Sequence, residues 1–565
     1  MTMPAAREQL IGIQKRLVEE LKESVYDTMG RDDAAMDAYY REYRVEFQQG
    51  FERAASRDEI IQRLMRANVA YLGDYHTLRT AQSAELDLLS AAAERGRKIV
   101  IAAEMVHAAD QQHVADYLSG AIDEDAFLWR VKWDKSWGFP WASWKRFFEL
   151  ARRHNAPLFG LNLQSDAADA LEQRDEYSGR LVSSLTQLYP DRLVAVVYGD
   201  LHLAPTHLPA VVERELAQWG IKRKCVTIYQ NSETLYWKLV EARLEHVVDY
   251  LKLKRDVYVV MNATPLVKFQ SFANWQHRRH VALAHDEDEL DMLGDTGLAE
   301  QVAGYIRTIS ELLGIELEER DNFELYTAAD LDLLENMVKR GIYTAEEMNA
   351  LKDYVHMAES AFFERARVLY IGNFTVANAA EAAGRYIMAA LRPVSTEPVA
   401  ARDEFYARCM VEALAFFCSK IIDPGRAARD EDDWQQVLKQ YGRRRKLGRI
   451  QKLDVFTARA FVRHKQYVRR VLEKNSYAGP PGALYGLPTD QHVAVTRALG
   501  RALGERLFAA LGEEIVTAAQ IVEAMQDPIR EPDVSRNRYF EFQRQLQGQS
   551  RTHSARHRRP RSFDE

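Results

Sequence analysis

The sequence predicts an α/β fold, in which a mainly parallel sheet is flanked by helices, followed by a second, all-helical domain. Three observations lead to this prediction. Short apolar runs alternate with amphipathic helical patterns from residue 61 to about residue 240. Two of these runs end in the same pattern, Gly-Asp-x-His, at residues 73–76 and 199–202. From about residue 296 onward only helical periodicity recurs.

The composition is that of a globular protein. The chain has 565 residues, enough for two to four domains, and 47% of them are hydrophobic. A formal net charge of −7 gives no general attraction to nucleic acid, so no nucleic-acid partner is expected. The cysteines Cys225, Cys409 and Cys418 lack metal-ligand spacing, and their small number fits a reducing compartment. Without a secretory signal, a lipobox or a membrane span, we expect a cytoplasmic protein.

Four domains or segments follow along the chain. Residues 1–60 predict a helical extension, residues 61–285 the α/β domain, residues 286–545 the all-helical domain, and residues 546–565 a disordered tail. Apolar, β-branched runs predict the strands of the α/β domain, which begin near residues 69, 98, 157, 193, 224 and 257. Periodic runs between them predict helices over residues 77–95, 110–118, 123–131, 143–154, 167–189 and 209–220. A further short strand is expected over residues 265–272, before an acidic stretch at residues 286–295.

The candidate site lies where three predicted strands end. His76 and His202 close the two Gly-Asp-x-His patterns, and Glu104 ends the apolar run between them. Since ligands bind at the carboxyl edge of a parallel sheet, these side chains are candidates for one site. Two imidazoles and a carboxylate suit a divalent metal such as manganese, cobalt or zinc and leave a position open for water. The alternative is that each histidine only hydrogen-bonds a backbone carbonyl at a strand end.

Neighbouring residues have candidate roles around this site. We expect Asp74 and Asp200 to hydrogen-bond the histidines and to act with them in catalysis, although each could instead cap a turn or helix. Gly73 and Gly199 permit close approach of a ligand or a positive φ. A carboxylate at the end of an apolar run is costly unless it is paired or metal-bound, so Glu104 either ligates metal or accepts a proton from an attacking water.

These motifs resemble the superfamily that joins Tiki proteases, TraB proteins, erythromycin esterases and ChaN-like haem-binding uptake proteins. The resemblance covers roughly residues 65–235 and is closest to ChaN in residues 104–111, 117–120 and 156–162. It implies that Glu104 is an essential acidic residue. With it, several residues are expected to line the pocket: Gly73, Tyr75, Gly199, Gln111, Asn162 and Trp133.

The leading hypothesis is a metal-dependent hydrolase, in which metal-activated water attacks an ester or peptide carbonyl. The first alternative is a haem- or iron-binding protein without turnover, with Tyr75 and His76 as candidate axial ligands. The second is a scaffold with a vestigial site. The expected partner is therefore a small-molecule or peptide substrate, or haem, and the sequence leaves homo-oligomerisation open.

Overall fold

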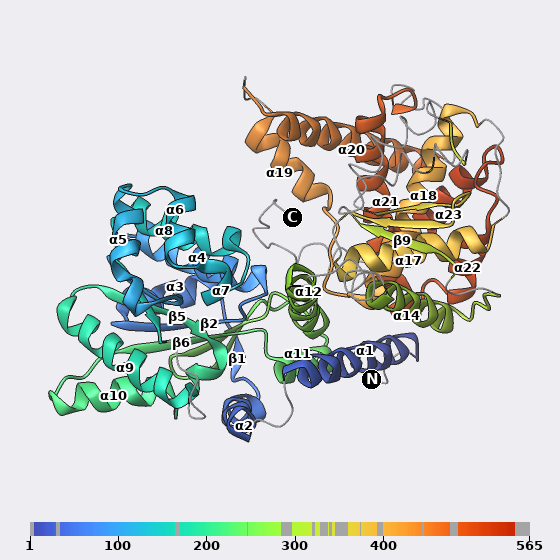
Figure 1. Ribbon diagram of the computed structural model, residues 1–565. Helices are drawn as coiled ribbons and strands as arrows, with labels where there is room; N and C mark the ends of the chain where they lie inside the picture. The colour runs from blue at the N-terminus through green and yellow to red at the C-terminus, as the bar shows by residue number, and fades with distance from the viewer. Residues whose placement is uncertain are drawn as a thin grey trace. The chain divides into compact units, whose positions relative to one another are not determined.

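The computed structural model describes most of the chain, and it divides into two compact units (Figure 1). The described residues are 5–29, 34–163, 170–245, 247–283, 296–318, 322–327, 337, 342–344, 360–372, 375–392, 399–442, 444, 446–474 and 484–548. One unit comprises Leu21–Trp275, and the other comprises Met1–Glu20 with Gln276–Glu565. Within the described residues, none of the helices has both the length and the apolar character that a membrane span requires.

An eight-stranded, mainly parallel sheet forms the centre of the Leu21–Trp275 unit. Its strands are β1 (Arg53–Ala54), β2 (Val69–Asp74), β3 (Ile99–His107), β4 (Leu158–Asn162), β5 (Leu193–Gly199), β6 (Cys225–Gln230), β7 (Tyr250–Lys254) and β8 (Val257–Val260). They lie in the order β1-β7-β8-β6-β2-β5-β3-β4. Only the β1–β7 and β7–β8 pairs are antiparallel. The predicted α/β class is thereby confirmed, and β1 brings part of the predicted amino-terminal extension into the sheet.

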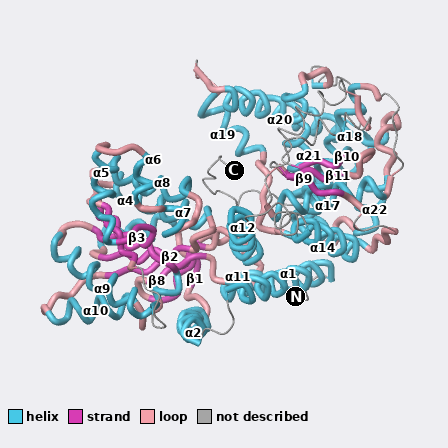
Figure 2. Tube along the Cα trace, viewed as in Figure 1, coloured by secondary structure: helices cyan, strands magenta, loops and turns pink. Residues whose placement is uncertain are grey.

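Helices cover both faces of this sheet (Figures 1 and 2). The helices of the unit are α1 (Ala5–Met29, in part), α2 (Ala34–Gln48), α3 (Arg57–Arg66), α4 (Arg79–Glu94), α5 (Gln111–Ser119), α6 (Glu124–Arg130), α7 (Trp133–Ser136), α8 (Trp141–His154), α9 (Ala170–Leu188), α10 (Leu208–Gln218), α11 (Glu233–Glu241) and α12 (Pro265–Leu283, in part). Helices α4 and α8 pack together over one face, whereas α9 and α10 lie over the other.

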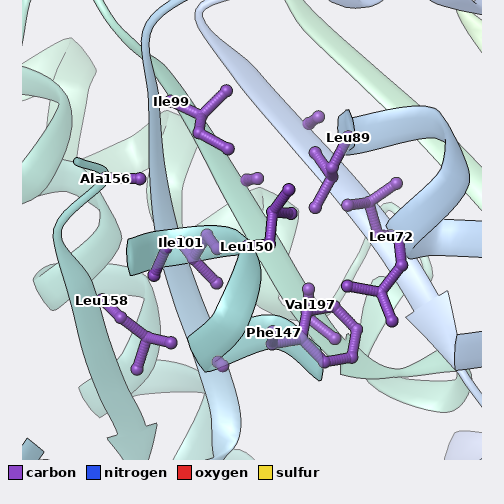
Figure 3. Close-up of a cluster of buried hydrophobic side chains, with 14 of the residues drawn as sticks. Leu72, Leu89, Ile99, Ile101, Phe147, Leu150, Ala156, Leu158 and Val197 are labelled. Atoms are coloured by element: carbon purple, nitrogen blue, oxygen red, sulfur yellow. The ribbon is translucent and has the colours of Figure 1, made fainter. Parts of the chain in front are cut away.

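Alternating strand residues build the core between the sheet and α4 and α8. Leu72, Ile101 and Val197 point to this face from three strands and are fully buried, as Figure 3 shows. Leu89 of α4 and Phe147 of α8 fill the space above them. Because burying one such side chain contributes about 1.5–3 kcal/mol, this face holds β2, β5 and β3 firmly side by side.

One predicted strand is wrong. Residues 265–272 lie in helix α12. Thr264 precedes the helix, and its hydroxyl oxygen accepts a hydrogen bond from the Val267 backbone N–H at 3.3 Å. Pro265 occupies the first helical position, where its missing N–H costs nothing. The cap and the proline therefore start a helix although the apolar run resembles a strand.

The other unit is mainly helical, as predicted, and it also contains a small sheet. Its helices are α14 (Thr296–Leu313), α17 (Val376–Ala390), α18 (Ala401–Ile422), α19 (Glu431–Tyr441), α20 (Arg449–Lys474), α21 (Thr489–Gly512), α22 (Ala518–Gln526) and α23 (Val534–Gln545). In the described part of the unit, the strands are β9 (Glu324–Thr327), β10 (Ser360–Phe363) and β11 (Val368–Ile371). These strands have four residues each, too few for the sequence to show a period.

Two predictions near the ends of this unit meet the limits of the described residues. The acidic stretch at 286–295 lies outside them, as does the predicted disordered tail from residue 549 onward. Residues 546–548 of that tail are ordered, because they form a short 3-10 helix in which the Leu546 side chain is fully buried. Burial of the Leu546 side chain explains why these three residues are ordered.

Glycines allow the central helices of this unit to approach closely. A Cβ atom on Gly504 of α21 would lie 2.3 Å from the Ala413 carbonyl oxygen of α18. A Cβ atom on Gly500 would lie 2.5 Å from the Glu412 Cβ atom. Interiors are too closely packed to absorb such overlaps, so α18 and α21 meet in this way only because both residues are glycine.

Candidate functional site

The order of the strands brings the predicted site residues to one edge of the sheet. Strand β2 pairs with β5 in a register that sets Asp74 opposite Gly199. Strand β5 in turn pairs with β3, with Ala103 opposite Val197, one residue before Glu104. The carboxyl ends of β2, β5 and β3 are therefore neighbours, which is the edge where parallel sheets bind ligands. Glu104 was expected to end its strand, but β3 continues to His107, so Glu104 lies three residues before the strand end.

A carboxylate–imidazole–carboxylate array occupies this edge. Asp74 Oδ2 lies 2.6 Å from His76 Nδ1, and the other Asp74 oxygen accepts a hydrogen bond from Gln82 Nε2 at 2.6 Å. On the far side of the imidazole, His76 Nε2 lies 3.7 Å from Glu104 Oε2. The Gly199 backbone N–H donates to that same Glu104 oxygen at 2.7 Å. The expected pairing of Asp74 with His76 is present, and Glu104 is fixed by the backbone of β5.

The charges around His76 favour its protonated form. Burial alone would lower the pKa of His76, but the Glu104 charge and the hydrogen bond to Asp74 outweigh burial and raise it. When the ring is neutral, the hydrogen bond to Asp74 keeps the proton on Nδ1 and leaves the Nε2 lone pair facing Glu104. His76 can therefore both accept and release a proton at Nε2.

Aromatic side chains surround His76. Its ring centroid lies 4.6 Å from that of Trp137, 5.1 Å from Phe139 and 6.2 Å from Trp144. Trp133, which was expected to line the pocket, is only 3% exposed and donates its indole N–H to the Phe139 carbonyl oxygen at 2.8 Å. Trp133 therefore belongs to the hydrophobic core. The aromatic side chains that contact His76 are Trp137 and Phe139.

His202 lies in a separate cluster. Its Nδ1 atom is 2.7 Å from Asp175 Oδ1 of α9, whose other carboxylate oxygen accepts a hydrogen bond from the Tyr39 hydroxyl at 2.7 Å. Within the described residues, no group of three or more His, Cys, Asp or Glu side chains is arranged to hold a metal ion. Among these described residues, His76, Glu104 and His202 therefore do not form the predicted three-ligand group, although the carboxylates that hydrogen-bond the two histidines do so at Nδ1 and not at Nε2.

Asp200 does not pair with His202, contrary to expectation. Residues Asp200–Leu203 form a 3-10 turn. The Asp200 carboxylate accepts hydrogen bonds from the Tyr43 hydroxyl at 2.7 Å and from the Gln230 backbone N–H at 3.3 Å. Burial raises the pKa of Asp200 to about 6, although several neighbours partly oppose the rise. Asp200 thus ties α2 and β6 to the end of β5.

Gly73 makes room for this carboxylate. A Cβ atom on Gly73 would lie 1.6 Å from Asp200 Oδ1, whereas one on Gly199 would lie 3.4 Å from the nearest side-chain atoms, those of Glu104 and His76. Neither glycine has a positive φ. The first glycine of the repeated pattern is therefore required by the Asp200 carboxylate and not by a ligand or an unusual backbone conformation.

The remaining predicted pocket residues differ in their roles. Gln111 bridges to β4, since its amide donates to the Leu158 carbonyl oxygen at 2.8 Å and accepts from the Gly160 N–H at 3.1 Å. Tyr75 lies under the Lys268 ammonium, which is 4.8 Å from the ring centroid. Asn162 ends β4 and is 8% exposed, and its Oδ1 atom is buried without a hydrogen-bond partner among the described residues.

The residues predicted for the site did not include Gln82, Trp137 and Phe139 around Asp74 and His76, nor three residues around the second pattern. Asp175 lies 27 residues before the histidine that it contacts, inside a predicted helix. Tyr39 and Tyr43 belong to α2, more than 130 residues from the aspartates that they contact. The only signal for the two tyrosines was their unusual concentration with Arg and Glu in one amphipathic helix, and nothing in the sequence indicated Asp175.

Comparisons with known proteins agree with the motifs. Residues 60–203 match the family described as "Haem-binding uptake, Tiki superfamily, ChaN". A solved structure, "Cofacial heme binding to ChaN of Campylobacter jejuni", is 14% identical, with a TM-score of 0.25, and the similarity covers 32% of this chain and 88% of that chain. No curated protein matches the chain. The resemblance seen in the sequence is thus confirmed over residues 60–203.

Proposed function

We propose that this chain, whose residues 60–203 match the ChaN family of the Tiki superfamily, hydrolyses an ester or peptide bond by acid–base catalysis at His76 and Glu104. The array of Asp74, His76 and Glu104 at the carboxyl edge of the sheet supports this proposal more than any other observation. An imidazole between two carboxylates, partly open to solvent, is suited to moving a proton to and from water. The substrate is a small molecule or a peptide.

The proposed mechanism follows from the hydrogen bonds of the array. Neutral His76 takes a proton at Nε2 from a water molecule, whose oxygen forms a bond to the substrate carbonyl carbon. Asp74 stabilises the resulting imidazolium through Nδ1. Glu104, held by the Gly199 N–H, orients the water by accepting its other hydrogen. His76 then gives its proton to the leaving oxygen or nitrogen as the bond to the carbonyl carbon breaks.

The proposed mechanism uses no divalent metal. Asp74 holds His76 Nδ1, the Gly199 N–H holds one Glu104 oxygen, and Asp175 holds His202 Nδ1. Within the described residues, His76, Glu104 and His202 form no three-ligand group, so no step is routed through manganese, cobalt or zinc.

Substitution of Glu104 or His76 is expected to abolish most of the proposed hydrolytic activity. Glu104→Gln and His76→Asn should each lower kcat/KM by at least about 100-fold, because general acid–base catalysis contributes roughly 10²–10⁴-fold. The assay is release of acid from a panel of nitrophenyl esters and acylated amino acids, with the exposed Glu94→Gln as the matched control. Activity that survives in both variants, or that disappears with a metal chelator, would contradict the mechanism.

The pH dependence follows from the raised pKa of His76. Neutral His76 acts as the base, so kcat/KM should rise with pH through a value above 6.5, the ordinary pKa of histidine. Asp74→Asn removes one group that raises the pKa, and it should move this limb to lower pH. The His76 Cε1–H resonance, followed by NMR, provides the same titration without turnover. A limb at or below pH 6.5 in the wild type would show that another group is the base.

Haem binding is the second candidate, since the matching family is described as haem-binding uptake. Tyr75 and His76 could hold the iron, and Trp137 and Phe139 offer apolar contact to a planar ring. One feature does not fit, because His76 Nε2 faces Glu104 at 3.7 Å. Absorbance titration decides between the candidates. A Soret shift that saturates near one haem per chain and is lost in Tyr75→Phe or His76→Ala supports binding, and a spectrum equal to that of free haem rejects it.

A further inference from the structure

Helix α9 places an arginine at the edge of the sheet that holds His76. Ser178 fixes the helix there, since its hydroxyl donates to the Leu161 carbonyl oxygen at 2.9 Å and lies 3.1 Å from the Tyr198 hydroxyl oxygen. Arg174 lies four residues earlier, one turn toward the helix start on the same face. Asp175, the next residue, contacts His202 just beyond the end of β5. Arg174 therefore stands over the carboxyl ends of β4 and β5.

The Arg174 side chain is half-buried. Its Nε atom is buried and has no hydrogen-bond partner among the described residues. Its charge acts on the neighbouring histidines. Burial is the main cause of the lowered pKa of His107, and the Arg174 charge adds to it. Burial and the Arg174 charge both work against the raised pKa of His76. The guanidinium thus supplies positive charge to the site that the acid–base array does not use.

Asn162 contributes an acceptor without a partner at the carboxyl end of β4. This residue ends β4 and pairs with His107 of β3, so it adjoins the strand that carries Glu104. The side chain is 8% exposed, and its Oδ1 atom is buried without a partner among the described residues. A buried acceptor of this kind is costly unless a ligand supplies a donor. Among the described residues, Arg174 therefore has one buried donor, Nε, and Asn162 has one buried acceptor, Oδ1, without a hydrogen-bond partner.

We propose that Arg174 binds a carboxylate of the substrate and that Asn162 accepts a hydrogen bond from an adjacent N–H group. This proposal rests on the proposed hydrolytic function and names its substrate class. A carboxylate beside an amide N–H is the group found at the end of a peptide or in an N-acylated amino acid. The planar guanidinium matches a carboxylate in charge and geometry. The amide carbonyl bonded to that N–H is then the group that water attacks at His76 and Glu104.

The test measures binding separately from turnover. N-acetylphenylalanine and N-acetylphenylalanine amide are titrated by calorimetry into full-length Glu104→Gln protein, which cannot turn the acid over under the proposed mechanism. The acid should bind about 10- to 100-fold more tightly than the amide, because a charge-assisted hydrogen bond contributes on this scale. Adding Arg174→Gln should remove the preference, whereas adding Arg180→Gln, an exposed arginine on the same helix, should keep it. Arg174→Lys, which retains the charge, should keep part of it.

Asn162 has its own comparison. The O-acetyl ester of phenyllactate lacks the N–H group, so it should bind more weakly than N-acetylphenylalanine, and Asn162→Ala should remove that difference. Equal binding of acid and amide, a preference that survives in folded Arg174→Gln protein, or tighter Arg174-dependent binding of phenyl phosphate would overturn the carboxylate assignment. If wild-type protein binds the acid but releases no phenylalanine, the hydrolytic function fails while the binding site stands.

Discussion

Glu381→Ala is expected to destabilise the mainly helical unit by about 3–5 kcal/mol, the usual cost of removing one partner from a buried ion pair. Glu381 of α17 is fully buried. Its Oε1 atom lies 2.7 Å from Arg426 Nη1 and 3.1 Å from Arg501 Nη2. Arg385, one turn along α17, binds Glu412 of α18 at 2.9 Å. Without Glu381, the half-buried Arg426 and Arg501 lose their shared counter-charge.

Calorimetry of the full chain measures this effect. A loss of this size should lower the Tm of the affected transition by roughly 10 °C. Burial alone would raise the pKa of Glu381, but the charges of Arg426 and Arg501, with those of other arginines, outweigh it and lower the pKa. The stabilisation is therefore present above the ordinary glutamate pKa and lost as pH falls toward the lowered value. The control is Glu404→Gln in the half-exposed pair with Arg408, which should cost under about 1 kcal/mol. Equal losses of Tm in both variants would show that the buried ion pairs of Glu381 stabilise the unit no more than the half-exposed pair does.

Gly73→Ala is expected to destabilise the α/β unit by at least about 3 kcal/mol, because a methyl group there has no room. Its Cβ atom would lie 1.6 Å from Asp200 Oδ1 and 2.8 Å from Asp200 Cγ. Asp200 cannot move away freely, since it accepts hydrogen bonds from the Tyr43 hydroxyl and the Gln230 N–H. The methyl group would therefore either break these bonds or push β2 away from β5.

The same pattern provides a matched control. Gly199→Ala adds a methyl group at ordinary contact distance, 3.4 Å from Glu104 Oε2 and His76 Cε1. This variant should fold with nearly unchanged Tm and show reduced activity, whereas Gly73→Ala should melt roughly 10 °C lower or accumulate in insoluble form. Wild-type Tm in Gly73→Ala would mean that Asp200 occupies another position, and the Tyr43 contact would then also be in doubt.

The sequence was sufficient for the local elements of the α/β unit. Apolar runs bounded by polar turns located β2, β3 and β5, and the repeated Gly-Asp-x-His pattern marked the ends of β2 and β5 as a candidate site. The pairing of Asp74 with His76 was also predictable, because only one residue separates them and a strand end brings them together. The reverse holds for residues 265–272, where an apolar run resembled a strand but a threonine cap and a proline began a helix.

Long-range contacts decided the rest of the site. The second pattern has the same letters as the first, yet His202 pairs with Asp175 from α9, and Asp200 accepts the Tyr43 hydroxyl from α2. Nothing in either segment specifies these partners, since they depend on which helix covers which strand end. The sequence predicted His76, Glu104 and His202 as one set of metal ligands. The contact of His202 with Asp175 depends on the position of α9, which neither pattern specifies.

By itself, the sequence determined where apolar strands and helices form and which polar side chains stand at their ends, because hydrophobic period and turn chemistry act over a few residues. The tertiary structure alone decided the strand order that sets β5 between β2 and β3, the helices that supply Asp175 and Arg174, and the pairing of four-residue strands β9 and β11. These features depend on packing between segments far apart in the chain. A local sequence pattern does not specify which distant segment will pack against it.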